Sequence, residues 1–165
     1  MKPVGIRLFT AKRLAGLSLP MSYTHNRTRE LWQSFMPQKM RLPGWSSREM
    51  YSLQVYPPGY RMMETDPAVG FVKWAAVALD EGEALPAGLS ELWLPGGEYA
   101  VFVHEGPAAA FIKTFQGIFL DWLPTSGYNV DERPHFELLQ PGYRPDDPLA
   151  TEQIFIPVQP LNTLK

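Results

Sequence analysis

The chain has 165 residues, a formal net charge of −2 and no cysteine. This length fits one domain or two small intertwined halves, and the scattered basic residues form no stripe that would indicate a nucleic-acid partner. The lack of cysteine excludes disulfides and thiolate chemistry. No apolar run is long enough to cross a membrane, and charged residues interrupt the N-terminal segment, so we expect a cytoplasmic protein with no membrane partner.

The first half of the chain predicts a strand-rich unit with one helix. Its strand-like segments are residues 4–9, 14–22, 50–56 and 69–79. Thr24 or Asn26 can cap a helix that we expect to end at Pro37, since proline does not continue a helix. Residues 80–97 are polar and rich in glycine and proline, which predicts a connection without regular structure.

The second half predicts the same succession of elements. Strands are expected at residues 98–104, 135–140 and 153–158. Gly106 and Pro107 stand where a helix begins, and the helix is expected to run to Trp122. Its apolar residues recur at helical spacing, which indicates a helix packed on a sheet: Phe111, Phe115, Ile118, Phe119 and Trp122.

A tetrapeptide repeat relates the two halves. Pro-Gly-Tyr-Arg occurs at 58–61 and at 141–144, 83 positions apart, and an Asp-Pro pair follows each copy at 66–67 and 147–148. The repeat predicts a single α+β domain over residues 1–165, made by tandem duplication of a strand-helix-strand-strand unit. The duplicated units span about 4–79 and 94–158. We expect a curved antiparallel sheet with two helices on one face and a ligand groove on the other.

The repeat also indicates which side chains face the groove. It aligns Gln54 with Glu137 and Tyr56 with Leu139. Strand alternation places Gln54 and Tyr56 on one face, with His135 and Glu137 on the corresponding face of the other half. The apolar residues between them are expected to face the helices: Tyr51, Leu53, Val55, Phe136 and Leu138.

Glu137 is the candidate centre of the site. A carboxylate in the middle of a strand is either a residue on a solvated sheet face or a partly desolvated acid in an aromatic groove. In the second case its pKa rises and it attracts a cation or a hydrogen-bond donor. The expected ligand-binding residues are Glu137, Gln54, Tyr56, Trp74, Trp93 and His135. Trp93 is either a lid ring or a loop anchor, and Lys73 is more typical of an edge residue than of a catalytic one.

No spacing typical of a metal site, a phosphate loop or a nucleophile elbow is present, so we predict no catalytic residue, metal or cofactor.

Four motifs of the second half, in order, resemble those of a known family. They are Leu-Pro-Gly-Gly-Glu-Tyr-Ala-Val-Phe at 94–102, Trp-Leu-Pro-Thr-Ser-Gly-Tyr at 122–128, Pro-His-Phe-Glu at 134–137 and Ile-Phe-Ile-Pro-Val at 154–158. The family is the GyrI-like (gyrase-inhibitor-like) small-molecule-binding superfamily, which includes effector-binding domains of AraC-type and multidrug-responsive transcription regulators. The resemblance implies a groove between the halves in which Glu137 meets a ligand that is often cationic and aromatic. Leu139 stands where the family often has tyrosine, and Lys73-Trp74-Ala75 lacks an acid usual there.

We therefore expect a stand-alone domain that captures amphipathic, cationic aromatic molecules. The alternatives are a small hydrolase of electrophilic compounds that uses Glu137 as a base, and a gyrase-inhibitor-like protein-interaction factor. The chain has no room for a helix-turn-helix pair before Met50, so no direct nucleic-acid contact is expected. A regulator or a gyrase-type protein is the macromolecular partner that the resemblance allows.

Overall fold

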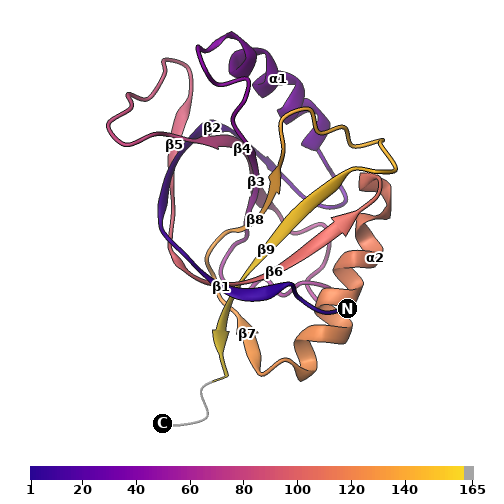
Figure 1. Cartoon of the computed structure of the whole chain (residues 1–165). Coiled ribbons are helices and arrows are strands. Elements are labelled where there is room, and N and C mark those ends of the chain that lie inside the picture. The colour runs from indigo at the N-terminus through magenta and orange to yellow at the C-terminus, as the bar shows by residue number, and fades with distance from the viewer. Residues whose placement is uncertain (162–165) are drawn as a thin grey trace.

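The computed structural model describes residues 1–161 as a nine-stranded antiparallel sheet with two helical segments packed against it (Figure 1). The strands are β1 (Gly5–Phe9), β2 (Lys12–Met21), β3 (Met50–Val55), β4 (Phe71–Ala78), β5 (Ser90–Leu94), β6 (Gly97–Glu105), β7 (Tyr128–Val130), β8 (His135–Leu139) and β9 (Thr151–Pro160). The helices are α1 (Thr28–Arg41) and α2 (Phe111–Gln116). Short helical turns flank α2: η1 (Ala108–Ala110), the π-helical η2 (Gly117–Trp122) and η3 (Leu123–Thr125). Within residues 1–161, no helix has the length and apolar character needed to cross a bilayer.

The order of the strands is symmetric about the pair β3 and β8. The sheet runs β1-β6-β9-β8-β3-β4-β2-β5, with β7 paired to β9. Each half contributes one outer strand to the other half, because β1 pairs with β6 and β5 pairs with β2. This arrangement confirms the predicted curved antiparallel sheet with two helices. β5 lies inside the connection predicted for residues 80–97, where the flanking glycine and proline residues conceal it.

The connection between β1 and β2 closely approaches the connection between β5 and β6, and Arg133 bonds to the strands beside it. A side chain at Gly96 would lie 2.7 Å from the carbonyl oxygen of Phe9, so only glycine fits at this approach. The guanidinium of Arg133 donates to the carbonyl oxygens of Glu98 at 2.8 Å and Val158 at 3.1 Å. It also lies over the ring of Tyr99, 4.6 Å from its centroid.

The repeated sequence corresponds to a repeated pair of turns. Gly59 and Gly142 both have positive φ, +81° and +85°. In each copy the amide of the tyrosine that follows donates to the carbonyl oxygen of the residue before the tetrapeptide, Pro57 at 3.1 Å in the first and Gln140 at 3.0 Å in the second. Further along, the side chains of Asp66 and Asp147 each accept the amide hydrogen two residues on, at 2.9 and 2.8 Å. The similarity of the halves therefore lies in the turns that join β3 to β4 and β8 to β9.

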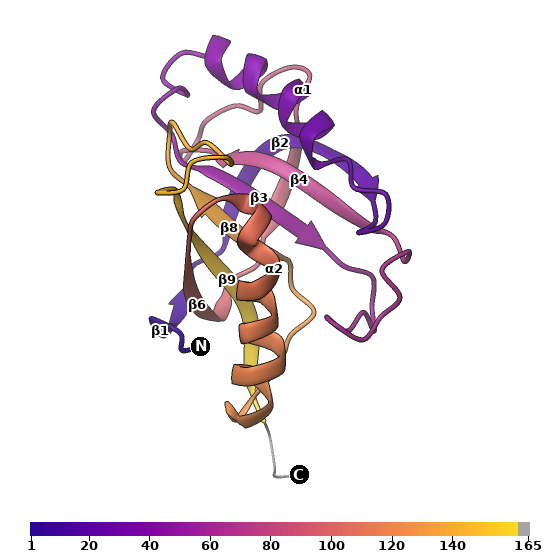
Figure 2. The same cartoon turned by 90° about the vertical axis from the view of Figure 1, so that its right-hand side faces the viewer.

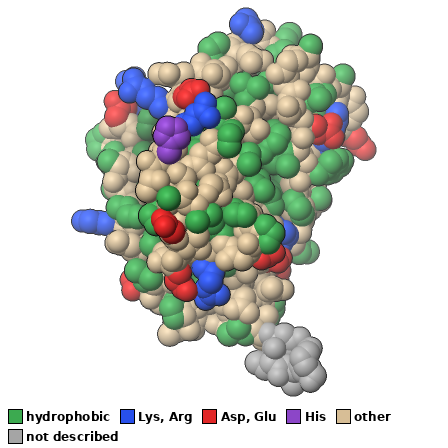
Figure 3. Space-filling view, turned by 180° about the vertical axis from the view of Figure 1, so that it is seen from behind, with side chains coloured by type: hydrophobic (Ala, Val, Ile, Leu, Met, Phe, Trp, Pro, Cys, Tyr) green, Lys and Arg blue, Asp and Glu red, His purple; other side chains and the backbone are tan. Residues whose placement is uncertain are grey.

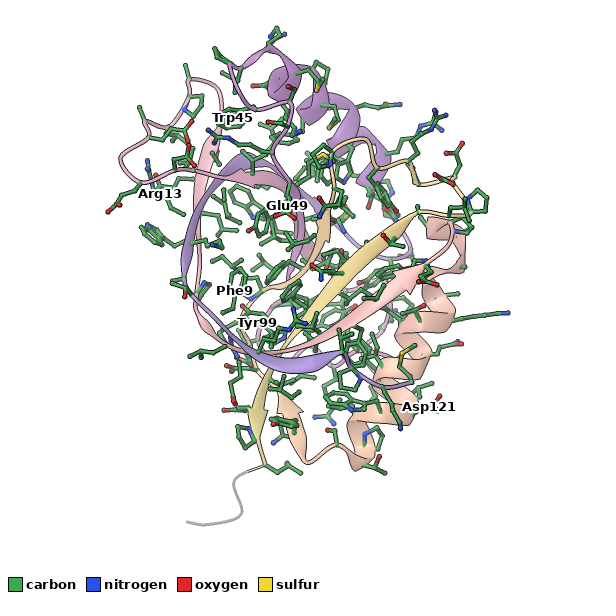
Figure 4. The ribbon with its side chains drawn as sticks, viewed as in Figure 1. Phe9, Arg13, Trp45, Glu49, Tyr99 and Asp121 are labelled. Atoms are coloured by element: carbon green, nitrogen blue, oxygen red, sulfur yellow. The ribbon has the colours of Figure 1, made fainter. Side chains whose placement is uncertain are left out.

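The inner face of the curved sheet is filled by aromatic rings. Figure 4 shows Phe9 and Tyr99 inside the curve, and the rings that gather there are Phe9, Tyr51, Tyr99, Phe136 and Phe155. Both helices pack on the outer face, α1 over β2 and β4, and α2 over β6 and β9. The expected groove opposite the helices is therefore replaced by a packed core. Leu53, Phe136 and Leu138 turn into this core and not toward the helices, because the outer strands close over the more apolar face.

Helix α1 extends one turn beyond its predicted end. Pro37 lies inside the helix, which continues to Arg41, although proline removes one backbone hydrogen bond. The loop after the helix folds back on the last turn, where the ammonium of Lys39 donates to the carbonyl oxygen of Ser46 at 3.2 Å. Lys39 and Trp45 are both almost fully buried. This tertiary packing stabilises the last turn of α1, which the local sequence alone does not predict.

Gly16 provides a test of the close approach between β2 and β4. A Cβ at this position would collide with the carbonyl oxygen of Ala75 and lie 2.7 Å from the Cα of Ala76. We expect Gly16→Ala to lower the free energy of unfolding by about 2–3 kcal/mol, measured by chemical denaturation. Gly5→Ala is the matched control, since its nearest neighbour would be Arg7 Nε at 3.8 Å, and its effect should stay within about 0.5 kcal/mol. Equal effects of the two substitutions would contradict this packing.

Candidate functional site

Four of the six predicted site residues come together on the outer face of the sheet. In the register of the central strands, Ser52 pairs with Glu137 and Gln54 pairs with His135. Figure 2 looks onto this face and shows β3 and β8 between α1 and α2. Tyr56 directly follows β3 and contacts His135, with 4.9 Å between the ring centroids. The candidate site therefore lies on the helix-bearing side, at the junction of the two halves.

Trp74 and Trp93 do not join this group. Trp74 packs against the inner core, because strand alternation turns it away from the face that carries Lys73. Trp93 lies on β5 and is 59% exposed. Lys73, expected as an edge residue, is instead a buried member of the site. The signal available in the sequence was a lysine in the middle of the most apolar strand.

The centre of the site is a buried polar cluster. Glu137 and Gln54 are only 4% and 3% exposed. The Nε2 of Gln54 donates to Glu137 Oε1 at 3.0 Å, and the Nζ of Lys73 lies 3.9 Å from the same oxygen. Among residues 1–161, neither Glu137 Oε2 nor Gln54 Oε1 has a hydrogen-bond partner. A second buried acid, Glu152, accepts a hydrogen bond from the Tyr143 hydroxyl at 2.7 Å.

Burial determines the ionisation of this cluster. It raises the pKa of Glu137 to about 7, against the opposing charge of Lys73 and with a further upward contribution from Glu152. Burial also lowers the pKa of Lys73 and raises the pKa of Glu152. Burial, and then the charge of Arg133, lower the pKa of His135 to about 3, so its imidazole is neutral at physiological pH. Glu137 is thus the group of this cluster whose pKa lies near neutral pH.

An aromatic cluster covers one side of these polar groups. The ring of Tyr56 stacks on Tyr60 with 4.5 Å between centroids and meets Phe71 at 5.1 Å. The hydroxyl groups of Tyr56 and Tyr23 share a hydrogen bond. The sequence analysis did not select Tyr23, Tyr60 or Phe71 as site residues. Tyr60 belongs to the repeated Pro-Gly-Tyr-Arg at 58–61, so the repeat was a signal for it, whereas Tyr23 and Phe71 reach the site from separate segments without a regular spacing.

A hollow of about 760 Å³ lies beside the aromatic cluster. Its lining comes from both halves and is mixed. Rings and apolar groups are Tyr56, Tyr60, Met62, Phe119, Leu123 and His135, and the charged side chains are Arg61, Glu64, Asp131, Glu132 and Arg133. This volume is typical of pockets for drug-sized ligands, roughly 300–1,000 Å³. Glu137 lies two residues beyond His135 on the same strand face, roughly 7 Å further along. A bound molecule could therefore keep an aromatic body in the hollow and extend a polar group toward Glu137.

Charged groups are found both on the surface and in the buried cluster of the site. The face drawn in Figure 3 carries acidic and basic side chains interspersed, without a stripe of one sign. Within residues 1–161, no three His, Asp or Glu side chains gather closely enough to hold a metal ion. The buried cluster contains two carboxylates, Glu137 and Glu152, and one lysine, Lys73.

Two solved structures share this fold at low sequence identity. The chain superposes on SAV2435 bound to tetraphenylphosphonium with a TM-score of 0.71 and 17% sequence identity, over 96% of this chain and 94% of the other. It superposes on EcmrR, in a complex with DNA, with a TM-score of 0.64 and 12% identity, over 95% of this chain and 57% of the other.

The chain belongs to the GyrI-like small molecule binding domain family, whose model matches residues 2–159. This result confirms the resemblance seen in the sequence. The transcriptional regulator BrlR of Pseudomonas aeruginosa is 27% identical over 130 residues, which are 78% of this chain and 45% of BrlR. The chain thus spans about half the length of this curated relative.

The ionisation of Glu137 can be tested through the pH dependence of stability. Its pKa in the folded protein, about 7, lies above the ordinary value of about 4.3, so its contribution to stability is present below about pH 4 and is lost as the pH rises through 7. Between about pH 5 and pH 8, wild type should lose about 2 kcal/mol more unfolding free energy than Glu137→Gln, in denaturation at each pH. His135 and Lys73 are retained in both proteins. Parallel curves for the two proteins would contradict the assignment, and Glu64→Gln, an exposed acid, should follow wild type.

Proposed function

We propose that this domain captures amphipathic cations that carry aromatic groups, with Glu137 as the counter-charge. The observation that carries the proposal is a buried carboxylate at the junction of the two halves, beside a hollow that is partly lined by aromatic rings. One oxygen of this carboxylate accepts no hydrogen bond within the described part of the chain. The aromatic body would lie against Tyr56, Tyr60 and Phe119, and the positive charge would approach Glu137. Gln54 and His135 would orient the carboxylate and complete the wall.

The charge balance of the cluster favours a cation. Lys73 compensates only one of the two buried carboxylates, so a bound cation would replace the proton that otherwise neutralises Glu137. Each well-placed ring would add about 0.5–2 kcal/mol of cation–π attraction. The tetraphenylphosphonium complex of SAV2435 supports this ligand class, since that molecule is a cation surrounded by aromatic rings.

The relatives suggest a role in sensing. BrlR is a transcriptional regulator, and EcmrR was solved in a complex with DNA. In the proposed role, ligand binding by this domain would influence a DNA-binding partner or segment in the cytoplasm, without contact between this domain and DNA. Sequestration of a toxic cation would use the same site and the same interactions.

A second candidate is hydrolysis, with Glu137 as general base. The observation in its favour is the pKa of about 7, which suits proton transfer near neutral pH. In this case a reactive aromatic ester would be turned over by wild type and by Tyr56→Phe, and about 100-fold more slowly by Glu137→Gln. Absence of turnover by wild type across a panel of electrophiles would exclude this candidate and leave the binding role intact.

The binding proposal is tested with tetraphenylphosphonium and the uncharged triphenylphosphine oxide. Calorimetry should show that Glu137→Gln weakens binding of the cation by about 10–100-fold, or about 1.4–2.8 kcal/mol, and that it hardly affects the neutral compound. Binding of the cation to wild type should weaken by about tenfold from pH 8 to pH 6, because the cation then competes with a proton on Glu137.

Glu64→Gln is the matched control for this experiment. Glu64 also lines the hollow, but it is exposed and pairs with Arg61 at 3.0 Å, so its removal should change the affinity less than threefold. Similar losses in Glu64→Gln and Glu137→Gln would indicate general attraction by the acidic side chains that line the hollow, and the role of Glu137 would have to be abandoned.

A further inference from the structure

We propose that the site discriminates between cations with the same aromatic body by their hydrogen-bond donors, and that it binds one with N–H groups, as in an aromatic ammonium, amidinium or guanidinium, more tightly than its fully alkylated analogue. This inference rests on the proposed function and specifies its ligand class. It comes from two buried oxygen atoms that accept no hydrogen bond from residues 1–161, and from the lysine near one of them.

The polar groups nearest to the Glu137 carboxylate both approach the same oxygen. Gln54 Nε2 and Lys73 Nζ both approach Oε1, at 3.0 and 3.9 Å. The second carboxylate oxygen, Oε2, and the amide oxygen of Gln54 have no donor among residues 1–161. A buried acceptor without a partner costs about 1–3 kcal/mol, so the empty site contains two acceptors that an incoming N–H group would satisfy.

Lys73 does not fill this role. At 3.9 Å from Glu137 Oε1 its ammonium is beyond ordinary hydrogen-bond distance, and the charge of Glu152 attracts it as well. Lys73 therefore supplies positive charge to the cluster without supplying the missing donors. A ligand that supplied only charge would duplicate the contribution of Lys73, whereas a ligand with N–H groups would complete the hydrogen bonding.

The position of the hollow limits the shape of the ligand. His135 lines the hollow, and Glu137 lies roughly 7 Å further along the same strand face. The ring of Tyr56, hydrogen bonded to Tyr23 and packed on His135, stands at this boundary. A compact donor group on a short linker could pass once Tyr56 turns aside, while its aromatic body remained against Tyr60 and Phe119. A bulky trialkylated head group would have to displace more of this wall.

A purely aromatic site and a site with unpaired acceptors would prefer opposite members of a pair of primary and quaternary ammonium ions. In a purely aromatic site a quaternary ammonium binds better than a primary one, because it is less strongly hydrated and buries more apolar surface. In a site with two unpaired acceptors the primary ammonium gains hydrogen bonds that the quaternary ion cannot form. The sign of the preference therefore reports on the unpaired oxygens of Glu137 and Gln54.

The experiment compares naphthalen-2-ylmethylammonium with its N,N,N-trimethyl analogue by calorimetry on the full chain at about pH 8. Wild type should bind the primary ammonium at least about tenfold more tightly, and Gln54→Met should reduce this preference to less than about threefold. Glu64→Gln should retain the wild-type preference. Circular dichroism and thermal unfolding would establish that each variant is folded before its affinities are compared.

The possible results separate this inference from the proposed function. Equal affinities, or a preference for the trimethyl compound, together with loss of both in Glu137→Gln, would overturn the donor requirement and leave the cation-binding role standing. Failure of wild type to bind either ammonium or tetraphenylphosphonium would overturn both. A tenfold preference that persisted in Gln54→Met would overturn the part assigned to the amide oxygen of Gln54.

Discussion

The burial of Glu137 at the pairing of β3 with β8 is the constraint on which the rest of the molecule depends. A carboxylate that is only 4% exposed, with one oxygen unpaired, does not stabilise a fold. Lys73 and Gln54 reduce the cost without removing it, since both approach the same oxygen. A group held in this state is suited to exchange a proton for a charged ligand, and the proposed function follows from that property.

The architecture explains how such a group can be placed away from water. The outer strands of the two halves close the inner face over an aromatic core, with Arg133 binding carbonyl oxygens of both β6 and β9. The helices pack over the two wings of the sheet and leave the central strands between them (Figure 2). The polar residues Gln54 and Glu137 lie on these central strands, and residues of both halves line the hollow beside them.

The sequence predicted much of this fold from a few residues. The two Pro-Gly-Tyr-Arg copies marked equivalent turns, and strand alternation correctly placed Gln54 and Glu137 on one face of the central strands. Strand alternation did not show which face of the sheet the helices cover, because that depends on the pairing of β1 with β6 and of β5 with β2. The position of Trp74 in the inner core and the burial of Lys73 depend on this same assignment of the two faces of the sheet.

Other features depended on long-range packing that no local pattern records. The last turn of α1 continues past Pro37 because the following loop covers it, and Tyr23 and Phe71 meet Tyr56 from separate parts of the chain. The family resemblance of the second half, together with Glu137 in its Phe-Glu motif, did indicate the correct class of protein. Only the structure shows which side chains approach the carboxylate of Glu137.

The central claim is that Glu137 is a buried, readily neutralised carboxylate, and the most direct measurement is its own titration. Carbon-13 NMR of side-chain carboxyl groups, assigned by the signal lost in Glu137→Gln, would follow its ionisation with and without a bound aromatic cation. The account predicts an apparent pKa near 7 in the free protein and a clear fall when the cation is bound. A titration near the ordinary value of about 4.3 that a cation leaves unchanged would contradict it.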